Sequence, residues 1–172
     1  MYNNLLQKAT AMLTTKAVFN DAQFIQFLLV AFLSGAGGIP PRRSMDYGDL
    51  KIRNYNPKVD NYYKNSKLYF NVYKTSSTYG LQTIDVPKPL STLLKKWVKL
   101  NHTDYMLYST NKNKLSSPQV SRILNNAFGK AISTNMLRHI YLSNVYKNVP
   151  ALTQMENLAS QMGHSVSTAM VC

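Results

Sequence analysis

One apolar stretch near the beginning of the chain limits the folds that the sequence can adopt. Residues 24–33 are apolar apart from Gln26, and the sequence Gly-Ala-Gly-Gly-Ile-Pro-Pro follows at positions 35–41. Asn20 or Asp21 can cap a helix over the apolar stretch, and the glycines and prolines end it. A helix that is apolar on all sides is buried, and this one is too short to span a bilayer. We therefore predict a domain built around a buried helix near its N-terminus.

The rest of the chain combines helical patterns with one short region of strand composition. Residues 68–73 and 81–86 predict a β-hairpin around a turn at 74–80, a further strand is expected near 50–53, and 54–66 predicts a loop. Helical segments are expected over 42–49, 90–100, 119–130, 134–146, from Pro150 to about Met162, and after Ser165 or Ser167. The chain of 172 residues is thus expected to form a single domain. Its predicted fold class is mostly α with a small antiparallel β-sheet (α+β).

The chain is strongly basic, with 20 Lys and Arg against 7 Asp and Glu and a formal net charge of +13. The basic residues are spread along the sequence, so we expect the fold itself to present a positive surface. Nucleic acid is the first partner that such a surface indicates, and an anionic membrane is a distant second. The single cysteine, Cys172, excludes an internal disulfide and indicates a reducing, intracellular compartment that the sequence does not specify further.

Two basic positions in predicted turns are suited to handling a phosphate. Arg43 follows the break at 35–41 and begins a helical turn, so its guanidinium can contact a phosphate through two nitrogens. Arg42 points elsewhere on a helix, and only one of the pair can serve in this way. Lys74 begins the hairpin turn, where an ammonium can enter a DNA groove and give a proton to a leaving oxygen. Each signal, taken alone, is also what an ordinary surface residue gives.

A second basic group lies in the predicted helix over 134–146. The apolar stripe of this helix places Arg138 and His139 at the edge of a packed face, which favours a fixed guanidinium. We expect His139 to be either a satisfied residue of the core or a residue that supports the site without touching the substrate. His164 follows Gly163 in a predicted turn between two helices, where an imidazole can either face an anion or cap a helix.

Taken in order, four short motifs resemble those of the catalytic domain of tyrosine recombinases, the lambda-integrase-like family. The first is Arg43, followed three positions later by the acid Asp46 and seven positions later by an aliphatic residue. The second is the hairpin lysine, Lys74. The third is Leu-Arg-His at 137–139, and the fourth is Met-Gly-His-Ser at 162–165. The Pro-Pro pair before the arginines is similar to integrases of virophages and of mobile elements associated with large DNA viruses.

The resemblance implies site-specific DNA recombination or integration without a metal or cofactor. In that family a tyrosine attacks a DNA phosphate, forms a 3′-phosphotyrosine and releases a 5′-hydroxyl. The implied catalytic residues are Arg43, Lys74, Asn135, Arg138 and His164, supported by Asp46 and His139, with DNA contacts from Arg42, Lys74, Lys112, Lys114 and Arg122. The implied partners are double-stranded DNA and, on DNA, a tetramer of the complete protein. For this chain alone we expect a monomer and no membrane association.

The sequence departs from the family pattern at two positions. Asn135 stands where the family commonly has a histidine, and an asparagine can donate to a phosphate oxygen but cannot shuttle a proton. The nucleophilic tyrosine is expected eight or nine residues after His164, at Cys172 or directly after it, and the sequence shows no tyrosine there. We therefore expect a catalytic-domain fragment that lacks its nucleophile and the N-terminal DNA-clamp domain of the family.

Other functions fit parts of the same pattern. A type IB topoisomerase uses the same chemistry, although the Gly-His-Ser sequence favours a recombinase. A non-catalytic DNA-binding module with a degenerate pocket would also suit the basic surface and the missing tyrosine. Metal-dependent integrases with three carboxylates are disfavoured, because the acidic residues stand singly and Glu156 is the only glutamate. Three scattered histidines and one cysteine likewise form no metal-ligand pattern.

Overall fold

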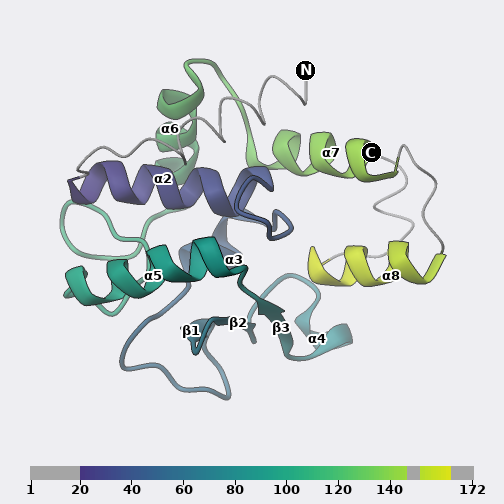
Figure 1. Ribbon diagram of the computed structural model, residues 1–172, viewed down its shortest axis with the longest axis horizontal. Helices are drawn as coiled ribbons and strands as arrows, with labels where there is room; N and C mark the ends of the chain where they lie inside the picture. The colour runs from purple at the N-terminus through teal and green to yellow at the C-terminus, as the bar shows by residue number, and fades with distance from the viewer. Residues whose placement is uncertain (1–19, 147–151, 164–172) are drawn as a thin grey trace.

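Over residues 20–146 and 152–163, which the computed structural model describes, the chain forms helices around one small sheet (Figure 1). The helices are α2 (Asp21–Ser34), α3 (Ser44–Gly48), α4 (Ser76–Tyr79), α5 (Lys88–Leu100), α6 (Ser117–Phe128), α7 (Thr134–Val145) and α8 (Leu152–Gln161). The strands are β1 (Tyr62–Lys64), β2 (Lys67–Phe70) and β3 (Gln82–Asp85). The predicted fold class is thereby confirmed, and the helix predicted after Ser165 lies outside the described residues. None of the described helices has the length and apolar character needed to cross a membrane.

Helix α2 runs through the middle of the molecule and supplies much of its core (Figure 1). It begins as predicted: Oδ1 of Asn20 accepts from the backbone nitrogen of Gln23 at 2.8 Å, and the Gln23 side chain accepts from the Asn20 nitrogen at 3.0 Å. Residues 27–33 are almost completely buried. Gly35 ends the helix with a φ of +84°, which glycine adopts without steric penalty. A Cβ there would lie 2.6 Å from the ring of Tyr141, so α7 packs closely on this end of α2.

The sheet has the order β1-β2-β3, and both neighbouring pairs are antiparallel. Leu68 and Phe70 of β2 and Ile84 of β3 are buried in the core, so one face of the sheet is apolar. The predicted hairpin is present, but its strands are shorter than the predicted 68–73 and 81–86 because the connection contains the helical turn α4.

Strand β1 corrects the prediction of a loop over residues 54–66. Tyr62 pairs with Tyr69 of β2, and the two rings stack with their centroids 4.5 Å apart. Tyr55 in turn stacks on Tyr62 at 4.4 Å. Such cross-strand pairs stabilise a strand that a polar, Asn-rich sequence does not reveal. The strand predicted near 50–53 was wrong: within that segment, which is described, only Lys51 forms isolated bridges.

The amphipathic helices α5 and α6 complete the core. In α5, Leu94 and Trp97 are buried, and Trp97 stacks on Phe24 of α2 with ring centroids 4.7 Å apart. Leu100, predicted on the same face, is exposed at the C-terminal end of α5. Helix α6, which packs on α2, begins as the Ser-Ser-Pro sequence predicts, because Ser116 caps it in a reciprocal pair with the residue at the third helical position.

Helix α8 packs between α7 and the sheet. Leu142 of α7 contacts Ala159 and Met162 in a small buried cluster. On its other side, α8 meets β3, where the amide of Gln82 donates to the hydroxyl of Ser160 at 2.9 Å. The C-terminal end of α8 therefore lies beside the sheet and close to the segment that precedes α3, which carries the two neighbouring arginines.

Candidate active site

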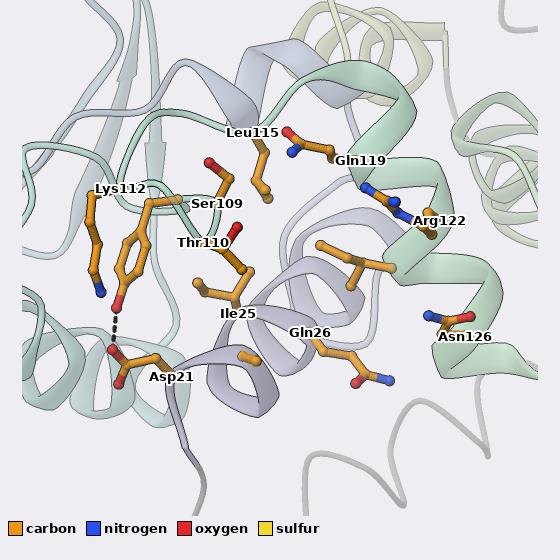
Figure 2. A pocket seen from close by; sticks show the side chains of 13 residues that line it. Asp21, Ile25, Gln26, Ser109, Thr110, Lys112, Leu115, Gln119, Arg122 and Asn126 are labelled. Atoms are coloured by element: carbon orange, nitrogen blue, oxygen red, sulfur yellow. Dashed lines mark hydrogen bonds between the residues drawn. The ribbon is translucent and has the colours of Figure 1, made fainter.

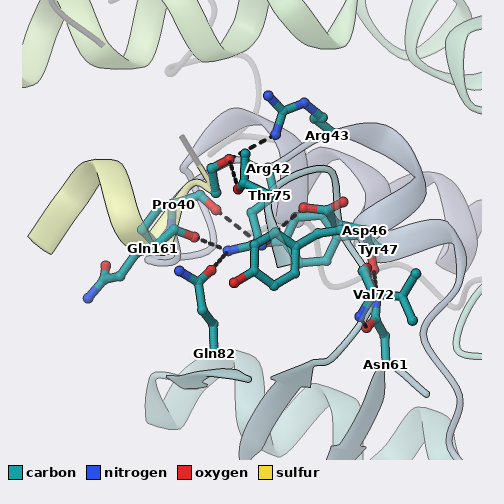
Figure 3. A network of polar contacts seen from close by, with 12 residues as sticks. Pro40, Arg42, Arg43, Asp46, Tyr47, Asn61, Val72, Thr75, Gln82 and Gln161 are labelled. Carbon is teal, nitrogen blue, oxygen red and sulfur yellow. Dashed lines mark hydrogen bonds and ion pairs between the residues drawn. The ribbon is translucent and has the colours of Figure 1, made fainter. Parts of the chain in front are cut away.

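The first arginine motif and the turn after α8 meet at one backbone oxygen. Arg43 occupies the N-cap position of α3, and its Nη1 donates to the carbonyl oxygen of Gly163 at 3.0 Å. The hydroxyl of Thr75, in the turn after β2, donates to the same oxygen at 2.9 Å (Figure 3). Gly163 immediately precedes His164 in the sequence. The structure thus brings together segments of the first, second and fourth motifs.

Lys74 is exposed in the turn between β2 and α4, next to Thr75. This turn is anchored by the buried Tyr73, whose hydroxyl donates to the carbonyl oxygen of Gly80 at 2.6 Å. Burial raises the pKa of the Tyr73 hydroxyl, so it remains a neutral donor at physiological pH. The ammonium of Lys74 is consequently available at the surface, while the backbone that carries it is held in place.

The second arginine motif lies on α7. Arg138 of α7 has only 6% of its surface exposed, and its Nη1 donates to Oδ1 of Asn135 at 3.3 Å. Burial, the largest influence, raises the pKa of Asp46, while the positive charges of Arg42, Arg43 and Arg138 act in the opposite direction. Asp46 thus pairs directly with Arg42 and is also influenced by the charges of Arg43 and Arg138.

Asn135 is exposed on the first turn of α7. Its carbonyl oxygen holds Arg138, which leaves the side-chain amide nitrogen as the group that can donate to a phosphate oxygen. In this arrangement Asn135 orients a guanidinium and can add a hydrogen bond.

Arg42 is not at the surface, and the prediction that it contacts DNA is wrong. None of its surface is exposed. Its Nε donates to the carboxylate of Asp46 at 2.9 Å, and its Nη1 donates to Oε1 of Gln82 at 2.8 Å and to the backbone oxygen of Gln161 (Figure 3). Of the two neighbouring arginines, only Arg43 is partly accessible and so able to meet a ligand.

The turn after α8 requires glycine at position 163 for two reasons. Its φ is +74°, a left-handed conformation that strains any other residue. In addition, a Cβ at this position would lie 3.0 Å from Nη2 of Arg42 and 3.4 Å from the ring of Tyr73. The glycine therefore allows the turn to close onto the buried guanidinium beneath it.

The other three predicted DNA contacts are Lys112, Lys114 and Arg122. A cavity of about 550 Å³ lies between the beginning of α2, the segment 108–115 and α6, with Lys112 and Arg122 on opposite sides of it (Figure 2). The Nζ of Lys112 lies 4.6 Å from the centre of the Tyr108 ring. Lys114 pairs with Asp49 at 2.7 Å, a hydrogen bond that raises the pKa of the lysine. Lys114 thus contacts the segment of the first arginine motif through Asp49, whereas no interaction of Lys112 or Arg122 with the arginine motifs is seen among the described residues.

Three predicted site positions remain. One is exposed, and two lie outside the residues that the structure describes. His139 is exposed on α7, which corrects the expectation of a place in the core, while its supporting role at the site stays a prediction. His164 and the predicted nucleophile position at Cys172 lie outside the described residues. Within residues 20–146 and 152–163, no three His, Cys, Asp or Glu side chains gather as the ligands of a metal ion would.

Two residues of the site were not among those predicted from the sequence. Thr75 shares the oxygen of Gly163 with Arg43, and its place beside Lys74 is a local signal that could have indicated it. Gln82 joins Arg42 to Ser160, and its partners lie 40 and 78 positions away in the sequence. No local pattern could have indicated Gln82.

Several solved structures that are similar to this chain are recombinases or integrases. The chain matches the XerA recombinase over 98% of its own length and 56% of that chain, with 15% identity and a TM-score of 0.68. It matches the XerH site-specific recombinase, in a pre-cleavage complex with its difH substrate, over 99% and 49% of the two chains, with 20% identity and a TM-score of 0.63. It matches a lambda integrase dimer bound to a core site over 99% of its own length and 45% of that chain, with 17% identity and a TM-score of 0.54. The chain has the recombinase fold.

The likeness extends to this recombinase fold alone, because the sequence identities are low. No protein-family model matches the sequence, and no curated protein matches it. The chain spans about half the length of the solved structures that it matches. The mostly helical arrangement with a three-stranded antiparallel sheet matches the fold of tyrosine recombinase catalytic domains.

Proposed function

We propose that this chain is the catalytic part of a site-specific DNA recombinase, which cuts and rejoins DNA strands through a 3′-phosphotyrosine. The observation that carries the proposal is the meeting of Arg43, Thr75 and Gly163 at one oxygen. The positive charge of Arg138 acts on Asp46, which lies three residues after Arg43. These segments belong to the motifs that resemble tyrosine recombinases, and the fold agrees with that resemblance.

In the proposed reaction, Arg43 and Arg138 neutralise the non-bridging oxygens of one DNA phosphate. The charge on these oxygens must be stabilised as the phosphorus becomes five-coordinate, and donors that are already fixed do this without reorganisation. Each such donor is typically worth ~3–4 kcal/mol. The backbone oxygen of Gly163 holds Arg43, and the side-chain oxygen of Asn135 holds Arg138. The fold therefore sets the direction of both guanidinium groups.

Lys74 is the proposed general acid. As the tyrosine oxygen bonds to phosphorus and gives up its proton to solvent, the bond from phosphorus to the 5′-oxygen breaks, and Lys74 gives that oxygen a proton. Asn135 and His164 add hydrogen bonds to the phosphate. The covalent intermediate keeps the energy of the broken bond, so the 5′-hydroxyl of a second strand can reverse the attack and complete strand exchange.

The nucleophile is not among the tyrosines near Arg138. Tyr141 and Tyr146 pack against the buried cluster between α7 and α8 and are unsuited to attack a phosphate. The resemblance to tyrosine recombinases indicates a nucleophile at Cys172 or directly after it. We therefore propose that the 172-residue chain binds DNA and that cleavage requires a tyrosine at or just after position 172.

The proposed partner is double-stranded DNA. XerH was solved in complex with its difH substrate and lambda integrase with a core site, and the net charge of +13 gives this chain the sign that attracts a polyanion. We propose a tetramer of the complete protein on DNA and a monomer for this chain alone. The Pro-Pro sequence before the arginines further leads us to propose an origin in virophages or in mobile elements associated with large DNA viruses.

Covalent attachment to nicked suicide DNA tests the proposal. Two tyrosine-bearing chains, Cys172→Tyr and a chain with one tyrosine added after Cys172, are mixed with a pool of nicked duplexes of varied sequence. We expect at least one to form a protein–DNA adduct that survives denaturing electrophoresis. Arg43→Ala or Arg138→Ala should abolish the adduct, whereas Lys96→Ala, an exposed position on α5, should leave it unchanged.

Other outcomes of the same experiment identify the alternatives. Chains that bind DNA but never become attached to it would be non-catalytic DNA-binding modules, and the proposal would be wrong. An adduct combined with relaxation of plasmid supercoils, without exchange between two sites, would indicate a type IB topoisomerase instead.

A further inference from the structure

Arg42 is one of the largest fully buried side chains among the described residues, and it carries a charge. Its guanidinium lies between two aromatic rings, with Cζ 4.3 Å from the centre of Phe70 and 4.9 Å from that of Tyr73. Its Nε pairs with the carboxylate of Asp46 at 2.9 Å. A charge in such a place depends on its partners, because removing it from water is strongly unfavourable.

The remaining contacts of Arg42 join segments that are distant in the sequence. Nη1 donates to Gln82 of β3 at 2.8 Å and to the backbone oxygen of Gln161 at the end of α8. Gln82 also donates to Ser160 at 2.9 Å. The end of α8 is therefore fastened to the sheet and to the beginning of α3 by a polar network centred on one guanidinium (Figure 3).

The same guanidinium limits where the turn after α8 can lie. A Cβ added to Gly163 would be only 3.0 Å from Nη2 of Arg42, so the backbone of the turn lies directly against it. On this turn, the oxygen of Gly163 receives the hydrogen bonds of Arg43 and Thr75. Arg42 thus supports, from the interior, the backbone group that fixes Arg43.

Stability alone does not require a charged residue at this position. Replacing a buried ion pair by well-packed apolar side chains is often neutral or stabilising. An apolar side chain at position 42, however, could not donate to Asp46, Gln82 and Gln161 together. The fork of donors that arginine alone provides accounts for the contacts observed.

We propose that Arg42 is a positioning residue of the recombination site. It clamps the turn Gln161–Gly163 against α3 and β3, so that the Gly163 oxygen holds Arg43 in the direction required by a phosphate. The clamp also fixes the backbone that leads to His164. The role in catalysis rests on the proposed function, whereas the clamp is a property of the fold that can be tested without DNA.

Amide hydrogen exchange of the 172-residue chain measures the clamp directly. The Gly163 amide donates to the oxygen of Ser160 at 2.9 Å, so its protection reports whether the turn is closed. Arg42→Lys keeps a positive charge beside Asp46 but lacks the fork of donors. We expect it to speed exchange at Gly163 roughly tenfold, as the loss of about one net hydrogen bond predicts.

A second arginine provides the matched control. Arg53 also donates to backbone oxygens, those of Asn101, Thr103 and Val98, at the C-terminal end of α5. In Figure 1 this end of α5 and helix α8 lie on opposite sides of the molecule. Arg53→Lys should therefore loosen its own site and leave exchange at Gly163 unchanged.

Cleavage and binding, measured separately on a tyrosine-bearing chain, test the catalytic role. Arg42→Lys should slow single-turnover adduct formation about 10²-fold, the effect of misplacing a reacting group by about 1 Å. Its DNA dissociation constant should not change, because Arg42 is buried. A tenfold loss of DNA affinity with normal exchange at Gly163 would make Arg42 a DNA contact and overturn the proposal.

A milder variant covers the case in which substitutions of Arg42 prevent folding. Gln82→Ala removes one acceptor of Arg42 and the donor to Ser160, and it should also speed exchange at Gly163. Normal exchange and a normal cleavage rate in Gln82→Ala and in every Arg42 variant that folds would overturn the clamp. If no tyrosine-bearing chain cleaves DNA, the proposed function fails, and the exchange experiment still decides whether the clamp exists.

Discussion

Nη1 of Arg43 lies 3.0 Å from the backbone oxygen of Gly163, a residue 120 positions further along the chain. This contact joins two motifs that the sequence presents at opposite ends of the domain. It also uses only one of the five N–H donors of the guanidinium, and within the described residues no other hydrogen bond of this side chain is seen. Among the described residues the other four donors have no hydrogen-bond partner, so they are open to a ligand on a group whose orientation is already fixed.

Loss of the carboxylate beside Arg42 should strongly destabilise the fold. Asp46→Asn leaves a buried guanidinium without its counter-charge, and breaking a buried ion pair in this way typically costs ~3–5 kcal/mol. Urea unfolding at pH 7 measures the change. Asp85→Asn is the control, because the Asp85 side chain is 85% exposed and lies 3.7 Å from Lys67, and it should unfold like the parent. Equal stabilities of Asp46→Asn and the parent would contradict the network described.

Substitution of Gly163 should affect both stability and the turn itself. Gly163→Ala places a side chain at a φ of +74° and against Nη2 of Arg42, and the left-handed backbone alone costs about 1–2 kcal/mol. Gly129→Ala carries the same conformational cost, at a φ of +67°, at the end of α6. Both variants should lose stability in urea, but only Gly163→Ala should increase hydrogen exchange in α8. Similar exchange in the two variants would mean that the turn does not depend on close packing.

Stability should fall at alkaline pH because of Tyr47. Its hydroxyl is fully buried and donates to the oxygen of Pro40 at 2.9 Å, and burial raises its pKa above the ordinary value of about 10. The folded state therefore holds this proton more tightly than the unfolded state does. The contribution of Tyr47 is complete below pH 10 and is lost as the pH rises further, by about 1.4 kcal/mol per pH unit.

The variant Tyr47→Phe isolates this effect. It should be less stable at pH 7 by about 1–3 kcal/mol, because the buried oxygen of Pro40 loses its donor. Its free energy of unfolding should, however, fall less steeply than that of the parent between pH 10 and 11. Tyr79→Phe, at an exposed position, serves as the control and should keep the steep slope. Parallel slopes for all three proteins would rule out Tyr47 as the source.

The salt dependence of DNA binding should distinguish Lys74 from the other lysines. Each phosphate contact contributes about −0.9 to the slope of log K against log salt concentration. Lys74→Ala should therefore make the slope about 0.9 less negative, whereas Lys96→Ala on α5 should leave it unchanged. Fluorescence anisotropy titrations with one duplex at several salt concentrations give both slopes. Identical slopes for the two variants would remove Lys74 from the DNA interface.

The parts of the fold that could be predicted are those with local signals. Asn20 caps its helix as expected, since its partner stands three residues along the chain. The buried helix α2 follows from its apolar residues alone. Strand β1 could not be predicted, because its stability depends on the stacking of Tyr62 between two tyrosines from other segments.

In the candidate site, too, residues with a local sequence signal could be predicted, and residues with distant partners could not. The spacing of Arg43 and Asp46 indicated which of two neighbouring arginines faces a ligand, and the position of Arg43 beside Gly163 is consistent with that choice. No partner of Arg42 could be predicted, because Gln82 and Gln161 stand 40 and 119 positions away. For the same reason, an exposed DNA contact was expected where the structure has a buried ion pair.

The polar network around Arg42 also restricts how this sequence can change over time. Asp46 and Gln82 are useful to the fold only while an arginine stands between them, and that arginine is tolerable only while both remain. Their substitution effects are therefore expected to be strongly non-additive. Descendants of this chain should inherit positions 42, 46 and 82 as one unit, either kept whole or exchanged together for an apolar set.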